Sequence, residues 1–254
     1  IASGEELFRF SGQGALAGID AVAVSPDGAR VATGEFDNTV KHWEAATGKL
    51  LLTLFGHSSQ VVGLAYSADG SYLASASEDG TVKLWDAATG RELLTLSGHT
   101  SGVTGVAFSP DSSRLYSASR DGTARIWDIS PAAGRDWLNL VGHSGRVYGI
   151  AYRPDGAQLA TWSEDGTVKV WDAEDGKVLL TLDHQPTVSL SEVVYSPDGK
   201  RLAFGSGDHV EVVDATSGAA LLTSAPFADD AVAVVFSPDG RRIAAGSFGG
   251  LVRV

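Results

Sequence analysis

Residues 56–86 read GHSSQVVGLAYSADGSYLASASEDGTVKLWD, and this stretch recurs with small edits along the chain. It holds three runs of four to six residues in which apolar residues alternate with polar or small ones. Turns rich in glycine and aspartate separate the runs. Alternation with a period of two is typical of β-strands bounded by turns. The stretch is therefore a repeat unit, and the fold is predicted from it.

The spacing of the repeat is regular. A further apolar run, residues 92–96, precedes the next Gly-His pair, so each unit is predicted to form a four-stranded antiparallel sheet. A period of this length with four strands is typical of the blades of a β-propeller. The turn after the first run ends at positions 41 to 44 residues apart: Gly28, Gly70, Ser112, Gly156, Gly199 and Gly240.

The ordered elements of the unit resemble a known family. Gly-His, Ser-Pro-Asp-Gly, SxDGTVKLWD and AxTG follow one another at fixed offsets, and residues 56–86, 98–128 and 142–172 carry nearly the full set. They resemble the WD-repeat family of β-propellers over the whole chain. The resemblance implies an all-β fold of four-stranded antiparallel blades, and the count of units predicts six blades, or seven if the natural chain is longer.

The repeats predict a single propeller domain over residues 1–254, with units at about 14–55, 56–97, 98–141, 142–183, 184–225 and 226–254. Residues 2–10 align with 88–96, the outer strand of a blade, and residues 251–254 align with 81–84. We therefore expect this N-terminal outer strand to complete the last blade and close the ring. The chain contains no methionine, and processing or a longer natural chain would account for that.

Composition narrows the classes of partner. The formal net charge is −12, which argues against nucleic-acid binding and against attachment to an anionic membrane surface. No apolar run approaches the roughly 20 residues of a membrane span, and no signal peptide is evident. We predict no membrane insertion and a cytoplasmic location. The absence of cysteine excludes thiol chemistry.

Three units place a histidine, a hydroxyl, an aspartate and a tryptophan at matching offsets. The family resemblance implies a hydrogen-bonded tetrad inside each of these blades, with Ser77 or Ser119 as alternative hydroxyls of the same parity. A Ser-His-Asp set also suggests a hydrolase. An enzyme needs such a catalytic set only once, however, so its repetition in three units indicates a structural role. The predicted tetrads are His57, Ser75, Asp79 and Trp85; His99, Ser117, Asp121 and Trp127; and His143, Thr161, Asp165 and Trp171.

We therefore predict no catalytic residue, no enzymatic activity, no cofactor and no metal site. The aligned histidines lie on separate blades, and no HxH or HExxH spacing occurs. The aspartates of the SPDG turns have a local role, because aspartate accepts hydrogen bonds from the backbone of its own turn.

Several units depart from the pattern. The first has Ala15 where histidine would stand, and the fifth has Phe204 at the hydroxyl position. The sixth has Gly249 in place of the turn aspartate. The last two units are therefore expected to be less stable, and to open more readily, than the middle ones. The fourth has Trp162 where the others have glycine or alanine. This ring is either a filler where a neighbouring blade recedes or part of the lining of a site.

Partners of this family are typically bound on one rim of the channel. The resemblance implies that this rim is formed by the residue before the turn aspartate and by a bulge of the inner strand. Aromatic residues and arginine are favoured in binding hot spots, and if six blades close, Phe36 and Phe248 form an apolar patch with Val232. The predicted rim residues are Phe36, Glu78, Arg120, Glu164 and Phe248, then Asp20, Val62, Tyr148 and Val232, and Arg146, with Gly207, Thr104, Ser191, Gln60 and Asp230 aligned beside them.

The sequence therefore predicts a non-enzymatic scaffold that binds a protein segment or a peptide on this rim. The alternative is a sensory or regulatory propeller of a longer protein whose effector enzyme is not in this sequence. The missing methionine and the start inside a repeat favour that alternative.

Overall fold

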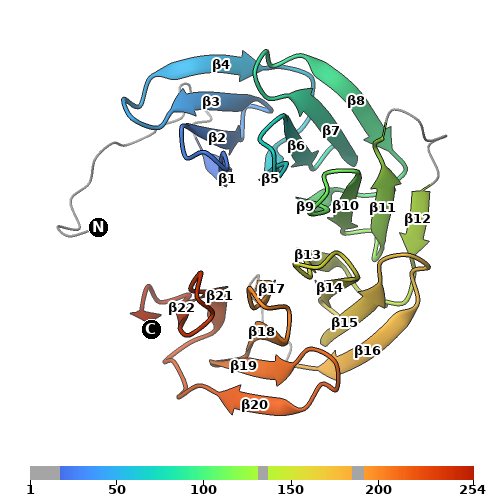
Figure 1. Cartoon of the computed structure of the whole chain (residues 1–254), viewed down its shortest axis with the longest axis vertical. Coiled ribbons are helices and arrows are strands. Elements are labelled where there is room, and N and C mark those ends of the chain that lie inside the picture. Colours follow the sequence, from blue (N-terminus) through green and yellow to red (C-terminus); the bar gives the residue numbers. More distant parts are fainter. Residues whose placement is uncertain (1–17, 131–136, 185–191) are drawn as a thin grey trace. The chain divides into compact units, whose positions relative to one another are not determined.

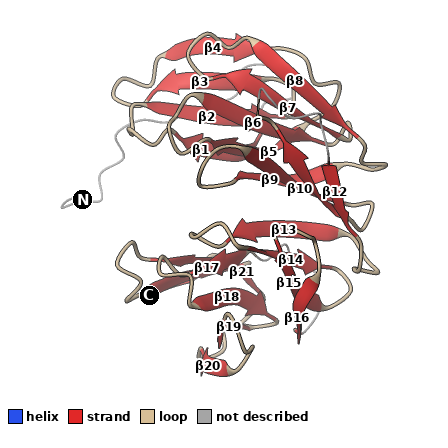
Figure 2. Ribbon diagram, turned by 45° about the vertical axis from the view of Figure 1, so that its right-hand side comes forward, coloured by secondary structure: helices blue, strands red, loops and turns tan. Residues whose placement is uncertain are grey.

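The structure, a computed structural model, describes residues 18–130, 137–184 and 192–254. Within these ranges every regular element is a β-strand and no helix occurs, as Figure 2 shows. The residues fall into two compact units, of which the first ends at Val106 and the second begins at Ala107. Figure 1 labels the strands in chain order.

The first two sheets lie in the first unit, and each is an antiparallel meander whose strands neighbour one another in chain order. The first sheet consists of β1 (Ile19–Val24), β2 (Arg30–Glu35), β3 (Val40–Glu44) and β4 (Leu50–Leu54), and the second of β5 (Val61–Tyr66), β6 (Tyr72–Ser77), β7 (Thr81–Asp86) and β8 (Glu92–Ser97).

The later sheets repeat this order, and the sixth has three strands within the described residues. The third sheet consists of β9 (Val103–Phe108), β10 (Arg114–Ser119), β11 (Ala124–Asp128) and β12 (Trp137–Leu140); the fourth of β13 (Val147–Tyr152), β14 (Gln158–Ser163), β15 (Thr167–Asp172) and β16 (Val178–Asp183); the fifth of β17 (Val193–Tyr195), β18 (Arg201–Ser206), β19 (His209–Asp214) and β20 (Ala220–Thr223); and the sixth of β21 (Ala231–Phe236), β22 (Ile243–Ser247) and β23 (Val252–Arg253).

The turn after each first strand follows from its residues. In the first sheet Ser25 Oγ donates to Asp27 Oδ1 at 2.6 Å, and the same oxygen accepts the amide of Ala29 at 2.9 Å. Gly28 then takes the left-handed conformation, with φ of 70°, which glycine adopts without a Cβ penalty. In the third sheet Ser112 takes this position at φ 58°. These turns fix where the second strand starts.

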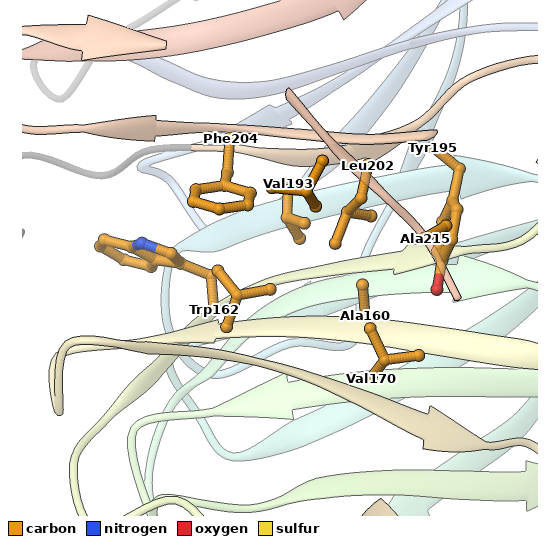
Figure 3. Close-up of a cluster of buried hydrophobic side chains, with 10 residues drawn as sticks. Ala160, Trp162, Val170, Val193, Tyr195, Leu202, Phe204 and Ala215 are labelled. Atoms are coloured by element: carbon orange, nitrogen blue, oxygen red, sulfur yellow. The ribbon is translucent and has the colours of Figure 1, made fainter. Parts of the chain in front are cut away.

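Within each unit the core lies between neighbouring sheets. Second strands such as β6 and β14 are buried at all residues after the first. Figure 3 shows the cluster between the fourth and fifth sheets, where Trp162 and Ala160 meet Phe204 and Leu202. Burial of such side chains removes apolar surface from water on both faces of a sheet.

The predicted all-β class of antiparallel sheets is confirmed. Residues 2–10, predicted to complete the last sheet, lie outside the described residues, so ring closure and the blade count remain predictions. No described element is a helix that is both long and apolar enough to cross a membrane.

Candidate functional site

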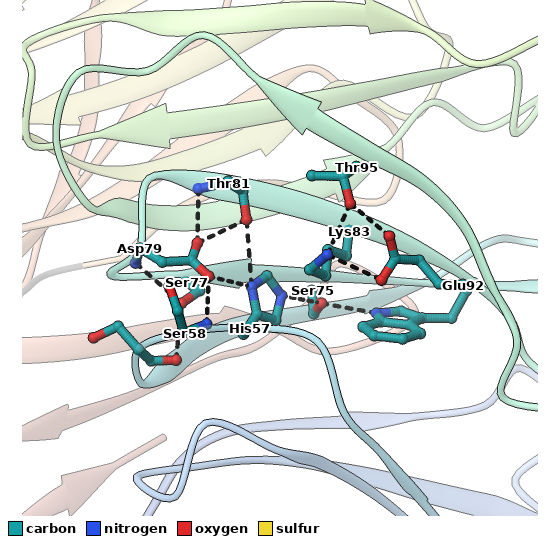
Figure 4. Close-up of polar contacts among 11 residues, drawn as sticks. His57, Ser58, Ser75, Ser77, Asp79, Thr81, Lys83, Glu92 and Thr95 are labelled. Atoms are coloured by element: carbon teal, nitrogen blue, oxygen red, sulfur yellow. Dashed lines mark hydrogen bonds and ion pairs between the residues drawn. The ribbon is translucent and has the colours of Figure 1, made fainter.

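A chain of hydrogen bonds crosses the second sheet from its core to its edge (Figure 4). Trp85 Nε1 donates to Ser75 Oγ at 2.8 Å, and Ser75 Oγ lies 2.7 Å from His57 Nε2. His57 Nδ1 lies 2.9 Å from Asp79 Oδ2, which also accepts the amide of Ser58 at 2.9 Å. The network therefore links β6 and β7 to the loop that precedes β5.

The charges in this network follow from burial and from hydrogen bonds. Burial lowers the pKa of His57, although its contact with Asp79 opposes the shift. Burial opposes ionisation of Asp79, but hydrogen bonds from Thr81, Ser58 and His57 lower the pKa of its carboxyl group. A neutral imidazole beside a carboxylate is the resulting state near neutral pH.

This network offers no nucleophile to a substrate. The Ser75 hydroxyl is completely buried and already bonded to an indole and an imidazole, and the His57 side chain is 1% exposed. A catalytic serine needs access to its substrate. The arrangement fits a structural role, in which polar groups inside the sheet satisfy one another.

The fourth sheet repeats the network. Thr161 Oγ1 accepts from Trp171 Nε1 at 2.7 Å and lies 2.8 Å from His143 Nε2. His143 Nδ1 lies 2.9 Å from Asp165 Oδ2. Although burial opposes ionisation, hydrogen bonds from Thr167, backbone and His143 lower the pKa of Asp165 to about 2.

In the third sheet Trp127 Nε1 donates to Ser117 Oγ at 2.8 Å, and Asp121 Oδ1 accepts the amide of Thr123 at 2.9 Å. The alternative hydroxyl of the second sheet, Ser77, has another role. It donates to the carbonyl of Ser59 at 3.0 Å and does not contact the indole.

The first sheet contains a network that the sequence pattern did not reveal. Trp43 Nε1 donates to Thr33 Oγ1 at 2.9 Å, and this hydroxyl donates to Glu35 Oε1 at 2.9 Å. Lys41 Nζ lies 3.0 Å from Glu35 Oε2 and 3.2 Å from Asp37 Oδ2. The buried Glu35 thus accepts the hydroxyl proton where the other networks have histidine. The signal was a glutamate at a position that later sheets fill with serine.

The predicted rim residues of the first unit lie at one end of the sheets. β1 and β5 each carry a register shift that leaves one extra residue, Asp20 in β1 and Val62 in β5. The amide of Phe36 bonds the carbonyl of Gly18 at 3.0 Å, and Glu78 bonds Gln60 in the same way. Each turn residue therefore stands beside the bulge of its own sheet.

The second unit repeats this arrangement. Tyr148 and Val232 are the extra residues of bulges in β13 and β21. The amide of Phe248 donates to the carbonyl of Asp230 at 2.9 Å, and the residue is 77% exposed. The aligned turn residues of the third and fourth sheets, Arg120 and Glu164, are exposed.

Arg146 and Glu164 form a loose pair at the rim of the fourth sheet. Their side chains approach to 3.9 Å, and each is 55% exposed. The aligned Ser191 lies outside the described residues.

Comparison with known proteins agrees with this geometry. The family described as WD domain, G-beta repeat matches residues 4–44, 48–86, 90–128, 136–172 and 223–254, well over half of the chain. The chain belongs to the WD40 family. An uncharacterized WD repeat-containing protein of Nostoc sp. (strain PCC 7120 / SAG 25.82 / UTEX 2576) is 54% identical over 46 residues, which is 18% of this chain and 3% of that protein.

Apart from Thr223, the fifth sheet falls outside the residues matched to WD40 repeats. Phe204 is fully buried at the hydroxyl position, and Val213 takes the place of the tryptophan. In the sixth sheet Phe227 and Ala245 stand where the histidine and the hydroxyl would be, and both are buried. Because Phe227 and Ala245 are both apolar, the sixth sheet has no tetrad hydroxyl or imidazole that would need a partner.

Trp162 is buried, with the residue 2% exposed, so its ring is not on the surface of the rim. Its ring centroid lies 5.4 Å from that of His184 with the planes 23° apart, and 5.3 Å from that of Tyr148. The WD40 pattern predicted Tyr148 at the rim but not the stack behind it. The signal was a tryptophan at a position of glycine and alanine.

Three or more histidine, cysteine, aspartate or glutamate side chains do not come together as a metal site anywhere in the described ranges. The exposed residues at the predicted rim positions include the aromatic ring of Phe248, the carboxylate of Glu164 and the guanidinium groups of Arg120 and Arg146.

Proposed function

We propose that this WD40 chain is a non-enzymatic scaffold that binds a protein segment or a peptide on the rim formed by its bulge and turn residues. The observation that carries the proposal is the bulge at the start of four first strands, which places Asp20, Val62, Tyr148 and Val232 next to the turn residues. Bulges re-aim side chains and are frequent beside functional sites.

The chemistry of the rim supports binding. Phe36 is 37% exposed and Phe248 77% exposed, whereas the aromatic residues of the tetrads are buried. Arginine and aromatic side chains dominate binding energy when a partner covers them. The polar groups of the tetrads are already bonded within the sheets, whereas Phe36 and Phe248 at the rim remain accessible to a partner.

The test is affinity capture from source cells with three baits, read by mass spectrometry. One bait is the unaltered chain, and the second carries Phe36→Ala, Tyr148→Ala and Phe248→Ala. The matched control carries Leu51→Ala, Leu179→Ala and Leu221→Ala, which are exposed apolar residues of outer strands. A protein retained by the first and third baits and lost with the second supports the rim; equal retention by all three contradicts it.

We further infer that six sheets close into one domain, with residues 2–10 as the fourth strand of the last sheet. In the second sheet Lys83 of the third strand pairs with Glu92 of the fourth at 2.9 Å. Arg253 stands at the position of Lys83, and Glu6 aligns with Glu92. A pocket of about 870 Å³ lies beside β23 and is lined in part by Leu222, Phe227 and Arg253.

The second candidate is a regulatory propeller of a longer protein with a separate effector enzyme. It is favoured by the relative from Nostoc, of which the matched stretch covers 3%. Sequencing of the natural transcript tests it. A reading frame that continues into an enzyme domain supports this candidate, and a frame limited to the WD40 repeats contradicts it.

A further inference from the structure

The predicted rim of the fourth sheet has an aromatic residue, Tyr148, whose ring packs on a buried tryptophan. Tyr148 is half-buried, and its ring packs on Trp162 at 5.3 Å with the planes 45° apart. Trp162 is stacked on His184 and packs against Phe204 of the fifth sheet, as Figure 3 shows for the last pair. The Tyr148 ring therefore loses little conformational freedom when a partner covers its exposed part.

Among the six aligned positions, a tryptophan that can support a rim residue occurs in the fourth sheet alone. Where the fourth sheet has Trp162, the other sheets have Gly34, Ala76, Ala118, Gly205 and Gly246. A large side chain at a position of small ones must be packed by its neighbours. Here His184, Tyr148 and Phe204 pack around the ring of Trp162. We call Tyr148, Trp162 and His184 the aromatic stack.

A carboxylate stands at the same end of this sheet. The amide of Glu164 bonds the carbonyl of Arg146 at 2.9 Å, which fixes Glu164 next to the strand that carries Tyr148. The side-chain pair with Arg146 is long, at 3.9 Å, and both groups are largely in solvent. Exposed pairs of this kind contribute little to stability, so a second cation can compete for Glu164.

We propose that this corner binds a basic side chain, arginine or lysine, of a partner peptide, with the cation on the ring of Tyr148 and a hydrogen bond to Glu164. A cation over an aromatic ring and a charge-assisted hydrogen bond are compatible in one guanidinium group. The net charge of −12 attracts basic segments and disfavours acidic ones. The proposal rests on the proposed function and names the partner class of the same rim.

The test begins with a displayed library of random 12-residue peptides selected against the whole chain at low salt. The rim triple variant and the outer-strand triple variant described above serve as parallel targets. We expect arginine and lysine to be enriched among peptides that bind the chain and the outer-strand variant but not the rim variant.

The affinity of one enriched synthetic peptide is then measured by calorimetry. Glu164→Gln and Tyr148→Leu should each weaken binding about five- to tenfold, in line with a cation–π contact or a charged hydrogen bond. Tyr148→Phe should bind as the unaltered chain does, because it keeps the ring. Glu174→Gln, an exposed acid in the turn after β15, is the matched control and should change nothing. Circular dichroism verifies that each variant is folded.

The outcomes separate this proposal from the proposed function. Neutral or acidic peptides that still depend on the rim overturn the basic-side-chain proposal and leave the scaffold. Basic peptides that are indifferent to Glu164→Gln and Tyr148→Leu also overturn it. Peptides that bind the rim variant equally well, or no enrichment at all, contradict both.

Discussion

At the scale of single residues, the tetrads show why a serine, a histidine and an aspartate recur together. A tryptophan buried between sheets brings an indole N–H with it, and that donor needs an acceptor. Ser75 is the acceptor, His57 bonds to Ser75, and Asp79 bonds to His57 and to the loop amide of Ser58. Each residue in the chain of bonds is required because the previous one is buried.

Replacement of Ser75 by alanine should therefore destabilise the protein. The change leaves the indole N–H of Trp85 and the imidazole of His57 without their shared partner, so we expect a loss of about 1–3 kcal/mol in the free energy of unfolding. Urea denaturation measures it. Ser97→Ala, at an exposed position of the same sheet, should change stability by less than about 0.5 kcal/mol; an equal effect of both would contradict the tetrad.

The buried pair Glu35–Lys41 should show strong coupling. Glu35→Gln leaves Lys41, whose side chain is 7% exposed, without its closer carboxylate, and removal of one partner of a buried pair costs about 3–5 kcal/mol. The double variant Glu35→Gln, Lys41→Met should lose less than the sum of the single variants. A double-mutant cycle by chemical denaturation measures the difference, and additive losses would refute the coupling.

His42 should make stability fall in acid. It is fully buried, and neither ring nitrogen has a hydrogen-bond partner among the described residues. Burial, assisted by the charge of Arg30, lowers its pKa to about 4. An unfolded chain has a histidine pKa near 6.5. Stability linked to the neutral state of His42 is therefore fully present above pH 6.5, and the free energy of unfolding falls as the pH drops from about 6.5 to 4.

His42→Leu should remove this part of the pH dependence, since other sheets have Leu84, Ile126 or Val170 at the position. The unfolding free energy of the unaltered chain should drop by about 2 kcal/mol more than that of the variant between pH 7 and pH 5. Parallel denaturation curves at the two pH values measure it. Identical losses would show that His42 is charged or solvated in the fold.

At the scale of elements, alternation and turn residues predicted the strands because both are local properties of the chain. The run predicted after the Asp79-Gly80 turn is β7 (Thr81–Asp86) in the structure. The run after the Asp165-Gly166 turn is β15 (Thr167–Asp172). Glu35 was missed because its role depends on Lys41 and Thr33 rather than on its own repeat position. The stack of Tyr148 on Trp162 was missed because two strands bring the rings together only in the fold.

The fifth sheet should open more readily than the second. It lacks the tetrad, and its β17 (Val193–Tyr195) is a short first strand. Sheets with fewer internal bonds exchange their amide protons through local opening of lower free energy. Hydrogen exchange read by mass spectrometry should find Val193 to Val213 less protected than Leu64 to Trp85, and equal protection would contradict this prediction.

At the scale of the whole molecule, the regular repeat predicted the family and the antiparallel sheets. Closure depends on residues far apart in the sequence. If Glu6 pairs with Arg253 as Glu92 pairs with Lys83, then Glu6→Arg and Arg253→Glu should each lower the melting temperature, and the double variant should recover part of the loss. Two independent losses that simply add would argue against this closure.

The binding rim stays a prediction: its position was inferred from the repeat, whereas the affinity of a partner would depend on side chains of several sheets acting together. Phe36 and Phe248 were found by alignment, and their exposure comes from the fold. Under the proposed function, the charge of −12 favours a basic partner segment over an acidic one.

The central claim is that the rim of bulge and turn residues is the binding face. It is tested most directly by calorimetry with the purified chain and the protein segment captured from source cells. We predict that Phe36→Ala, Tyr148→Ala and Phe248→Ala together reduce affinity at least a hundredfold, while Leu51→Ala, Leu179→Ala and Leu221→Ala together leave it unchanged. An unchanged affinity in the rim variant, with the fold intact by circular dichroism, would contradict the account.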